Sequence, residues 1–215
     1  MNKNLQVAKY VLFDLLSAAM AWTVFFFYRK YKTNPDLFNN IQYVFSDTNY
    51  YLGILVIPLF WLLLYIMVGT YRKIYRKSRL KELGQTISIT FFGVIFIFFS
   101  IILDDVILTY KSYYTSFLIL FLLHFSFTYL FRLIISTLTI RKIHRRIIGF
   151  NTIIVGSNEN AVKIFNDIEN EEISSGNKFV GFVNAFDYDE FLMSDKLPHL
   201  GQLESLRKIV EEMKV

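Results

Sequence analysis

The chain has 215 residues, of which 54% are hydrophobic and 19% charged, and it carries a formal net charge of +5 with no cysteine. The lack of cysteine excludes a disulfide-stapled secreted fold and a zinc site built on cysteine ligands. The apolar residues concentrate before residue 140 and most acidic residues follow it, which predicts a membrane part and a water-facing part. The basic residues cluster beside apolar segments, as membrane topology requires, so nucleic acid is not an expected partner.

The first 146 residues contain apolar segments of the length that spans a membrane. A helix needs about 20 apolar residues to cross roughly 30 Å of hydrocarbon. Windows that meet this requirement are Val11–Tyr28, Tyr51–Tyr71, Ile87–Leu103 and Tyr113–Phe131. We therefore expect a four-helix transmembrane α bundle over residues 1–146.

Three ionisable side chains fall within or beside these windows. Asp14 lies one turn inside the first window and Arg132 just beyond the fourth, so we expect both to reach the membrane interface by snorkelling. His124 lies deeper, and we expect a neutral imidazole that donates a hydrogen bond to a neighbouring helix.

The loop between the second and third windows is strongly basic. Since Lys and Arg accumulate on the cytoplasmic side, this loop, the N-terminus and the C-terminal segment are predicted to be cytoplasmic. Isoleucine and leucine interleave with the cations, which is typical of a helix that contacts anionic lipid headgroups at about 1 kcal/mol per basic residue. A polyprenyl phosphate is the more specific candidate ligand, and a role in topology alone is the alternative. The contact residues are Arg72, Lys73, Arg76, Lys77, Arg79 and Lys81.

Residues 147–215 show an alternation of strands and helices. The order of strand, glycine turn, helix, strand and helix predicts the opening of a doubly wound parallel sheet. Because the chain ends where a third strand is expected, we predict a truncated α/β Rossmann-like domain. The predicted elements are a strand at Thr152–Val155, a helix at Glu159–Glu171, a strand at Lys178–Val183 and a helix at Leu203–Met213.

The turn after the first strand is a degraded dinucleotide fingerprint. It begins with Gly156 and Ser157, but Asn158 stands where the second glycine of G-x-G-x-x-G would let a pyrophosphate approach. Asn184 occupies the end of the second strand, where an acidic residue would bind a ribose hydroxyl. These four residues are the candidate cofactor site, and we expect them to bind a nucleotide only weakly.

Several segments resemble the large polyprenyl glycosylphosphotransferases, most closely the undecaprenyl-phosphate glucose phosphotransferases of Bacteroidetes. The similar segments are Gly69–Leu83, Arg141–Arg146, Phe150–Ser157 and Lys178–Asn184. The resemblance implies four membrane helices in a bacterial inner membrane, followed by a Rossmann-like domain often described as CoA-binding and then a catalytic domain. Such enzymes transfer a sugar 1-phosphate from a UDP-sugar to undecaprenyl phosphate and start exopolysaccharide, capsule or O-antigen synthesis.

The resemblance also limits what this chain is expected to do alone. The Asp-Glu pair that works with Mg²⁺ in the family's catalytic domain has no matching positions here, so we expect no catalytic residue, metal site or cofactor within residues 1–215. The partners that follow are membrane lipid, polyprenyl phosphate, the catalytic domain and a second copy of the chain.

Two other functions remain open from the sequence. The chain could begin a membrane-bound nucleotide-sugar 4,6-dehydratase, which a downstream G-x-x-G-x-x-G followed by Tyr-x-x-x-Lys would identify. It could also be a transporter or channel subunit with a regulatory Rossmann domain. That class is expected to have a filter loop or paired charges within the membrane, and the sequence indicates neither.

Overall fold

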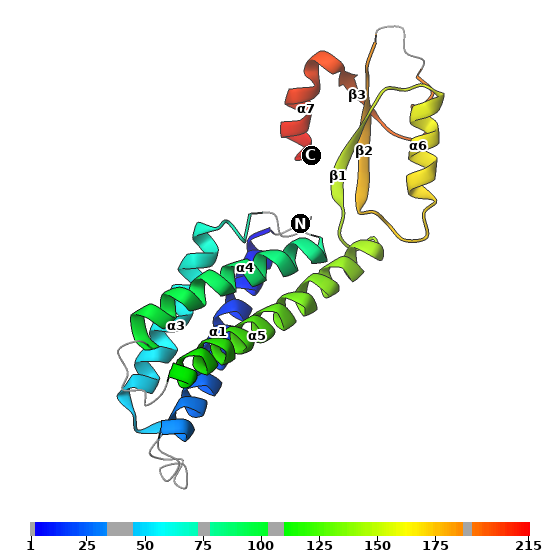
Figure 1. Ribbon diagram of the computed structural model, residues 1–215. Helices are drawn as coiled ribbons and strands as arrows, with labels where there is room; N and C mark the ends of the chain where they lie inside the picture. Colours follow the sequence, from blue (N-terminus) through cyan, green and yellow to red (C-terminus); the bar gives the residue numbers. More distant parts are fainter. Residues whose placement is uncertain (1–2, 34–44, 73–77, 103–109, 187–190) are drawn as a thin grey trace. The chain divides into compact units, whose positions relative to one another are not determined.

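A computed structural model of the protein describes residues 3–33, 45–72, 78–102, 110–186 and 191–215 (Figure 1). The chain divides into two compact units, residues 2–137 and residues 138–215.

The first unit is helical. Its described elements are α1 (Lys3–Thr33), α3 (Thr48–Met67), α4 (Arg79–Ile97) with a π-helical turn at Phe98–Ile102, and α5 (Tyr110–His144), which runs on into the second unit. Within the described residues four helices are long and apolar enough to cross a membrane, which confirms the predicted spans.

The helices do not begin and end where the predicted apolar windows do, because capping residues and glycines set the ends of a helix. Helix α4 begins at Arg79 rather than Ile87, since the Ser78 hydroxyl accepts a hydrogen bond from the Lys81 N–H at 3.2 Å and caps the first turn. Helix α3 ends at Met67 rather than Tyr71, because Gly69 adopts a φ of 72° that L side chains rarely take.

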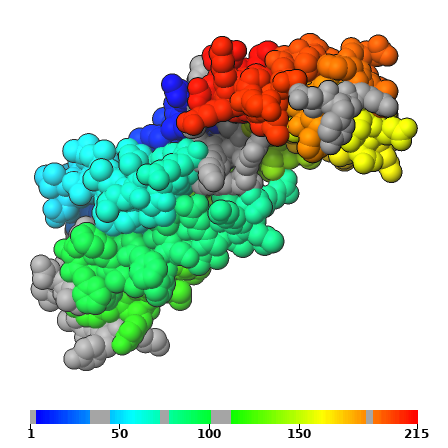
Figure 2. Space-filling view, turned by 90° about the horizontal axis from the view of Figure 1, so that it is seen from above, coloured from blue at the N-terminus to red at the C-terminus, as the bar shows by residue number. Residues whose placement is uncertain are grey.

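Two tryptophans are packed on glycines of neighbouring helices. A Cβ atom on Gly53 of α3 would lie 2.1 Å from the Trp22 ring of α1, and one on Gly93 of α4 would lie 2.3 Å from the Trp61 ring of α3. Small residues at such contacts let membrane helices approach closely. The outward faces are apolar, and Leu55, for example, is 62% exposed. In Figure 2, α3 and α4, in cyan to green, form neighbouring parts of this surface.

The second unit contains a parallel sheet. Its described strands are β1 (Phe150–Val155), β2 (Asn177–Asn184) and β3 (His199–Gln202), in the order β1-β2-β3. The expectation that the third strand would begin only where the chain ends was wrong. The strand lies at residues 199–202 and was missed because its four residues, His-Leu-Gly-Gln, include no β-branched side chain. With β3 present, the described sheet has the strand order of the first half of a doubly wound fold.

Two helices flank the sheet. Helix α6 (Glu159–Glu169) connects β1 to β2, and α7 (Leu206–Met213) follows a short 3₁₀ turn after β3. Figure 1 shows α6 and α7 on opposite sides of the strands, and in Figure 2 α7, in red, lies against the orange residues of β3. The core between α6 and the sheet consists of Ile154, Ala161, Phe182 and Met193.

Candidate functional site

The helical unit holds a buried ion pair between residues 118 positions apart. The Arg132 Nε–H donates to Asp14 Oδ1 and an Arg132 Nη2–H donates to Asp14 Oδ2, both at 2.8 Å. Arg132 is 1% exposed and Asp14 is 3% exposed. A two-pronged bond between guanidinium and carboxylate is the geometry that best offsets the cost of burying both charges.

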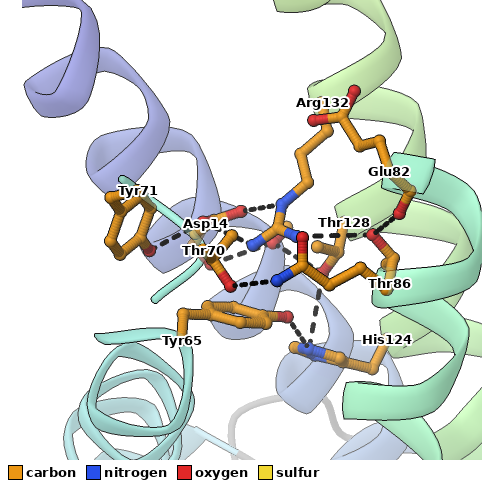
Figure 3. A network of polar contacts seen from close by, with 11 residues as sticks. Asp14, Tyr65, Thr70, Tyr71, Glu82, Thr86, His124, Thr128 and Arg132 are labelled. Carbon is orange, nitrogen blue, oxygen red and sulfur yellow. Dashed lines mark hydrogen bonds and ion pairs between the residues drawn. The ribbon is translucent and has the colours of Figure 1, made fainter. Parts of the chain in front are cut away.

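Neighbouring side chains complete the bonding of this pair (Figure 3). The Tyr71 hydroxyl donates to Asp14 Oδ2 at 2.8 Å, and an Arg132 Nη1–H donates to the Thr86 hydroxyl at 3.3 Å. The Tyr65 ring lies under the guanidinium, with its centroid 4.3 Å from Arg132 Cζ. The carboxylate and the guanidinium are therefore both held by groups from other helices or from the segment after α3.

A chain of hydrogen bonds beside this pair includes His124. The Tyr65 hydroxyl lies 2.9 Å from His124 Nε2, and the Thr128 hydroxyl lies 3.4 Å from the same nitrogen. Thr128 in turn contacts the Ser17 hydroxyl of α1 at 3.0 Å. The predicted contact of His124 with a neighbouring helix is therefore confirmed. Trp61 stacks on the imidazole, with ring centroids 3.6 Å apart.

The expectation that Asp14 and Arg132 snorkel to the interface was wrong. Both side chains turn inward because each supplies the countercharge of the other, and water access is then not needed. The same pair overturns the statement that the sequence indicates no paired charges within the membrane. A usable signal was present: His124, Thr128 and Arg132 recur every fourth residue and so line one face of a single helix.

The charged groups of this network are bonded to other side chains of the same network. The Asp14 carboxylate accepts three side-chain hydrogen bonds, and the guanidinium is held by Asp14, Thr86 and the Tyr65 ring. This arrangement fixes the positions of α1, α3, α4 and α5 relative to one another, and it leaves neither charged group poised as a nucleophile or base. Its chemistry is that of a structural tie.

The second candidate site lies at the carboxyl ends of β1 and β2. Gly156 has a φ of 101° and its N–H donates to the Val183 carbonyl at 2.8 Å, so the turn closes directly beside the end of β2. Asn184, the next residue of β2, is buried, and its Oδ1 has no hydrogen-bond partner among the described residues. The structure thus brings Gly156 and Asn184 to one edge of the sheet, as parallel strands require.

Asn158 and Ser157 have internal partners. The Asn158 side chain caps α6 by accepting the Ala161 N–H at 3.1 Å. The Ser157 hydroxyl is fully buried and accepts the Met193 N–H at 3.1 Å. Both side chains therefore stabilise the fold, a role that the sequence of the degraded fingerprint does not indicate.

These residues do not fit the pyrophosphate of a dinucleotide or of CoA. Such a group needs free N–H donors at the helix N-terminus and close backbone approach. Here the Ala161 N–H is taken by Asn158, and Glu159 adds an acidic side chain to the first turn. The buried Asn184 Oδ1 is an acceptor, which suits a neutral donor and repels phosphate.

The remaining predicted contact residues are only partly described. Arg72, Arg79 and Lys81 are exposed around the start of α4, as a headgroup contact requires, whereas Lys73, Arg76 and Lys77 lie outside the described residues. Within the described part of the chain, no three His, Cys, Asp or Glu side chains are grouped as metal ligands.

Comparison with known proteins places the chain in a family. A search of curated proteins finds no match to it. A family model described as the CoA-binding domain matches residues 67–215, from the end of α3 through α7. This domain is found in sugar transferases and is typical of the N-terminal regions of sugar-phosphate transferases. The chain belongs to the CoA-binding domain family.

Proposed function

We propose that this chain is the N-terminal membrane and Rossmann-like module of a polyprenyl-phosphate hexose-1-phosphate transferase. The enzyme would move glucose 1-phosphate from UDP-glucose to undecaprenyl phosphate and so initiate exopolysaccharide, capsule or O-antigen synthesis. Mg²⁺ and the reacting carboxylates would belong to a catalytic domain outside residues 1–215. The module itself would hold that domain at the surface of a bacterial inner membrane.

One observation carries this proposal. The family match covers membrane helices α4 and α5 together with the parallel sheet, so both parts belong to one arrangement that is typical of sugar-phosphate transferases. A soluble nucleotide-binding domain joined by chance to a membrane anchor would match over the sheet alone.

The basic residues at the start of α4 suit the lipid substrate. Arg79 and Lys81 are exposed in the first turn of α4, whose start Ser78 caps, and Arg72 is exposed after the end of α3. A polyprenyl phosphate carries its charge at the membrane surface, where basic side chains next to a membrane helix attract anionic headgroups. We propose that these residues face the cytoplasm and collect the acceptor lipid near the catalytic domain.

A transporter or channel subunit is the function that the Asp14–Arg132 pair would favour. Paired charges within a membrane often mark an ion or substrate path. Here both groups are almost fully buried and bonded to each other, and Thr86, Tyr65 and Tyr71 fill their surroundings. This geometry supports a packing role more than transport.

The activity is tested with the complete natural protein and with residues 1–215 alone, each purified and supplied with undecaprenyl phosphate, Mg²⁺ and UDP-glucose. We expect UMP release by the complete protein, its loss when EDTA removes Mg²⁺, and none from residues 1–215. Formation of a 4-keto sugar without UMP would instead identify a nucleotide-sugar 4,6-dehydratase. UMP release by residues 1–215 would contradict the assignment of catalysis to another domain.

The orientation is tested by single cysteines, for which the cysteine-free chain is well suited. In intact cells, Ser78→Cys should be protected from an impermeant thiol reagent and Ser112→Cys should be labelled. Both positions are exposed, so burial does not confuse the result. The reverse pattern would place the basic start of α4 outside the cell and contradict its proposed role with the acceptor lipid.

A further inference from the structure

We propose that the carboxyl edge of this sheet is closed by the chain itself. The described part of the connection from β2 to β3, residues 191–198, would close this edge together with the Asn158 cap, and the cap would take up an N–H group that could otherwise bind a phosphate. The Rossmann-like domain would then be a scaffold that holds no nucleotide or CoA. This inference does not depend on the proposed transferase function.

Two N–H groups of the turn already have partners within the chain. A phosphate at a doubly wound sheet is held by unpaired N–H groups at the start of the first helix. The Gly156 N–H already donates to the Val183 carbonyl at 2.8 Å, and the Ala161 N–H donates to Asn158 Oδ1 at 3.1 Å. One N–H group at each end of the turn is therefore occupied, and neither can bind a phosphate.

The connection to β3 returns to this turn at residues 192 and 193 and is hydrogen-bonded there. The Leu192 N–H donates to the Ser157 carbonyl at 3.2 Å, and the Met193 N–H donates to the Ser157 hydroxyl at 3.1 Å. One residue of the turn thus holds two successive residues of the connection. Ser157 and Met193 are both fully buried, so the connection packs tightly onto the turn at the carboxyl end of β1.

Side chains of the connection also contact α6 and the core beneath it. Met193 packs with Ile154, Ala161 and Phe182 in the core. Further along, the Lys196 ammonium donates to the Asn166 side-chain oxygen at 2.8 Å and lies over the Phe165 ring. Because apolar packing and hydrogen bonds act at separate points, displacing the connection would expose part of the core.

The side chains around the turn also disfavour a bound anion. Glu159 sits in the first turn of α6, where an anion would otherwise benefit from the helix dipole. The Asn184 Oδ1 is buried and offers an acceptor to any entering group. A phosphate would therefore meet an acidic side chain and an amide oxygen, even if the connection moved aside.

Hydrogen exchange of the full chain in detergent tests the closure directly. We expect the peptide over residues 191–197 to be protected, and to exchange about tenfold faster in Ser157→Ala, which removes one hydrogen-bond acceptor. Met193→Ala should have at least as large an effect. The matched control is Leu192→Ala, since that side chain is partly exposed and Leu192 contributes mainly its N–H. Protection of β2 in every variant would show that the sheet remains folded.

Calorimetry with CoA, NAD(H) and UDP-glucose tests whether the domain binds a nucleotide or CoA. We expect no binding tighter than about 1 mM to the wild-type chain, to Met193→Ala or to Ser157→Ala, because Asn158 and Glu159 remain in place. Micromolar affinity in the wild-type chain would overturn the proposal. So would a peptide 191–197 that exchanges as fast as unfolded chain. Binding gained by either variant would instead support closure by residues 191–197 and contradict the part assigned to Asn158 and Glu159.

Discussion

The helical unit and the α/β unit place their charges in opposite ways. In the helical unit the Asp14–Arg132 pair is buried while many large apolar side chains, such as Leu55, are exposed. In the α/β unit, pairs such as Arg207 and Glu211 lie on the surface. The apolar side chains of the second unit are instead gathered between α6 and the sheet. The solvent around each unit explains the difference, because lipid accepts apolar side chains and water accepts charges.

This contrast changes what an ion pair does. The Arg207 side chain is 95% exposed, so water and salt screen its attraction to Glu211 and the pair adds little. The Asp14–Arg132 pair has no solvent to screen it, and each charge depends on the other. The main effect of the pair is to favour one arrangement of the helices. Any arrangement that separates the two residues leaves two unpaired charges in the bilayer.

The largest effect is expected from breaking the buried pair on one side only. Arg132→Met leaves the Asp14 carboxylate buried without a countercharge, and removal of one partner of a buried pair costs about 3–5 kcal/mol. The free energy of unfolding of the purified protein in mixed detergents, followed by circular dichroism, would measure this loss. Asp14→Leu alone should have a similar effect.

The double variant Asp14→Leu with Arg132→Met sharpens the test. With both charges gone, we expect most of the lost stability to return, because apolar side chains of similar volume often replace a buried pair at little cost. Arg207→Met is the matched control on an exposed pair and should change stability by no more than about 0.5 kcal/mol. Equal losses for Arg132→Met and Arg207→Met would contradict the contrast between the two units.

The next largest effect is expected where tryptophans meet glycines in the helical unit. Gly93→Ala would put a methyl group 2.3 Å from the Trp61 ring, and overpacking of this kind costs about 1–3 kcal/mol. Gly84→Ala is a control within the same helix, because nothing lies within 4 Å of the point where its methyl group would stand. That variant should be neutral or stabilising by up to about 1 kcal/mol through helix propensity. The comparison fails if both substitutions have the same effect on unfolding.

The membrane-spanning helices of the first unit could be predicted from sequence, but the contacts between their buried polar side chains could not. Apolar length determines whether a segment can span a membrane, and every predicted window lies largely within an observed helix. Which way Asp14 and Arg132 point depends on a partner 118 residues away, and no local pattern contains that information. The stripe of His124, Thr128 and Arg132 reveals a polar helix face, though not what the face contacts.

The α/β unit shows the same limit at its candidate site. The glycine turn and the first two strands follow from short β-branched runs, whereas β3 has no such run and forms by pairing with β2. Asn158 was recognised as an obstacle to pyrophosphate, but its role as the cap of α6 depends on local geometry. The contact of Ser157 with Met193 joins residues from two loops, so it could not be predicted from either loop alone.

A smaller effect is expected from Asn158, and it separates capping from ligand binding. Asn158→Ala removes the acceptor for the Ala161 N–H and should cost about 1 kcal/mol, as loss of an N-cap usually does. Asn158→Gly recreates the second glycine of the fingerprint and should cost only a few tenths of a kcal/mol. We expect neither variant to bind CoA in calorimetry. Affinity gained by Asn158→Gly would show that this side chain alone excludes the ligand.

The smallest effect is expected from Asp47, whose contribution should depend on pH. The Asp47 carboxylate lies 2.5 Å from the Lys30 ammonium and accepts the Asn49 N–H at 2.9 Å, and the contact with Lys30 is the main reason that the pKa of Asp47 is lowered. A carboxylate with a lowered pKa stabilises the fold above its ordinary pKa of about 4, and this stabilisation is lost as the pH falls through the lowered value.

Asp47→Asn isolates that contribution, since asparagine also caps helices but neither titrates nor pairs with lysine. At pH 7 the wild-type protein should be more stable by about 0.5–1 kcal/mol, a modest amount because both side chains are partly exposed. The difference between the two proteins should shrink below about pH 4 and vanish once Asp47 is protonated. Lys30→Gln removes the same contact from the other side and should abolish the effect of Asp47→Asn. A difference that stays constant between pH 7 and pH 3 would mean that Asp47 acts through the cap alone.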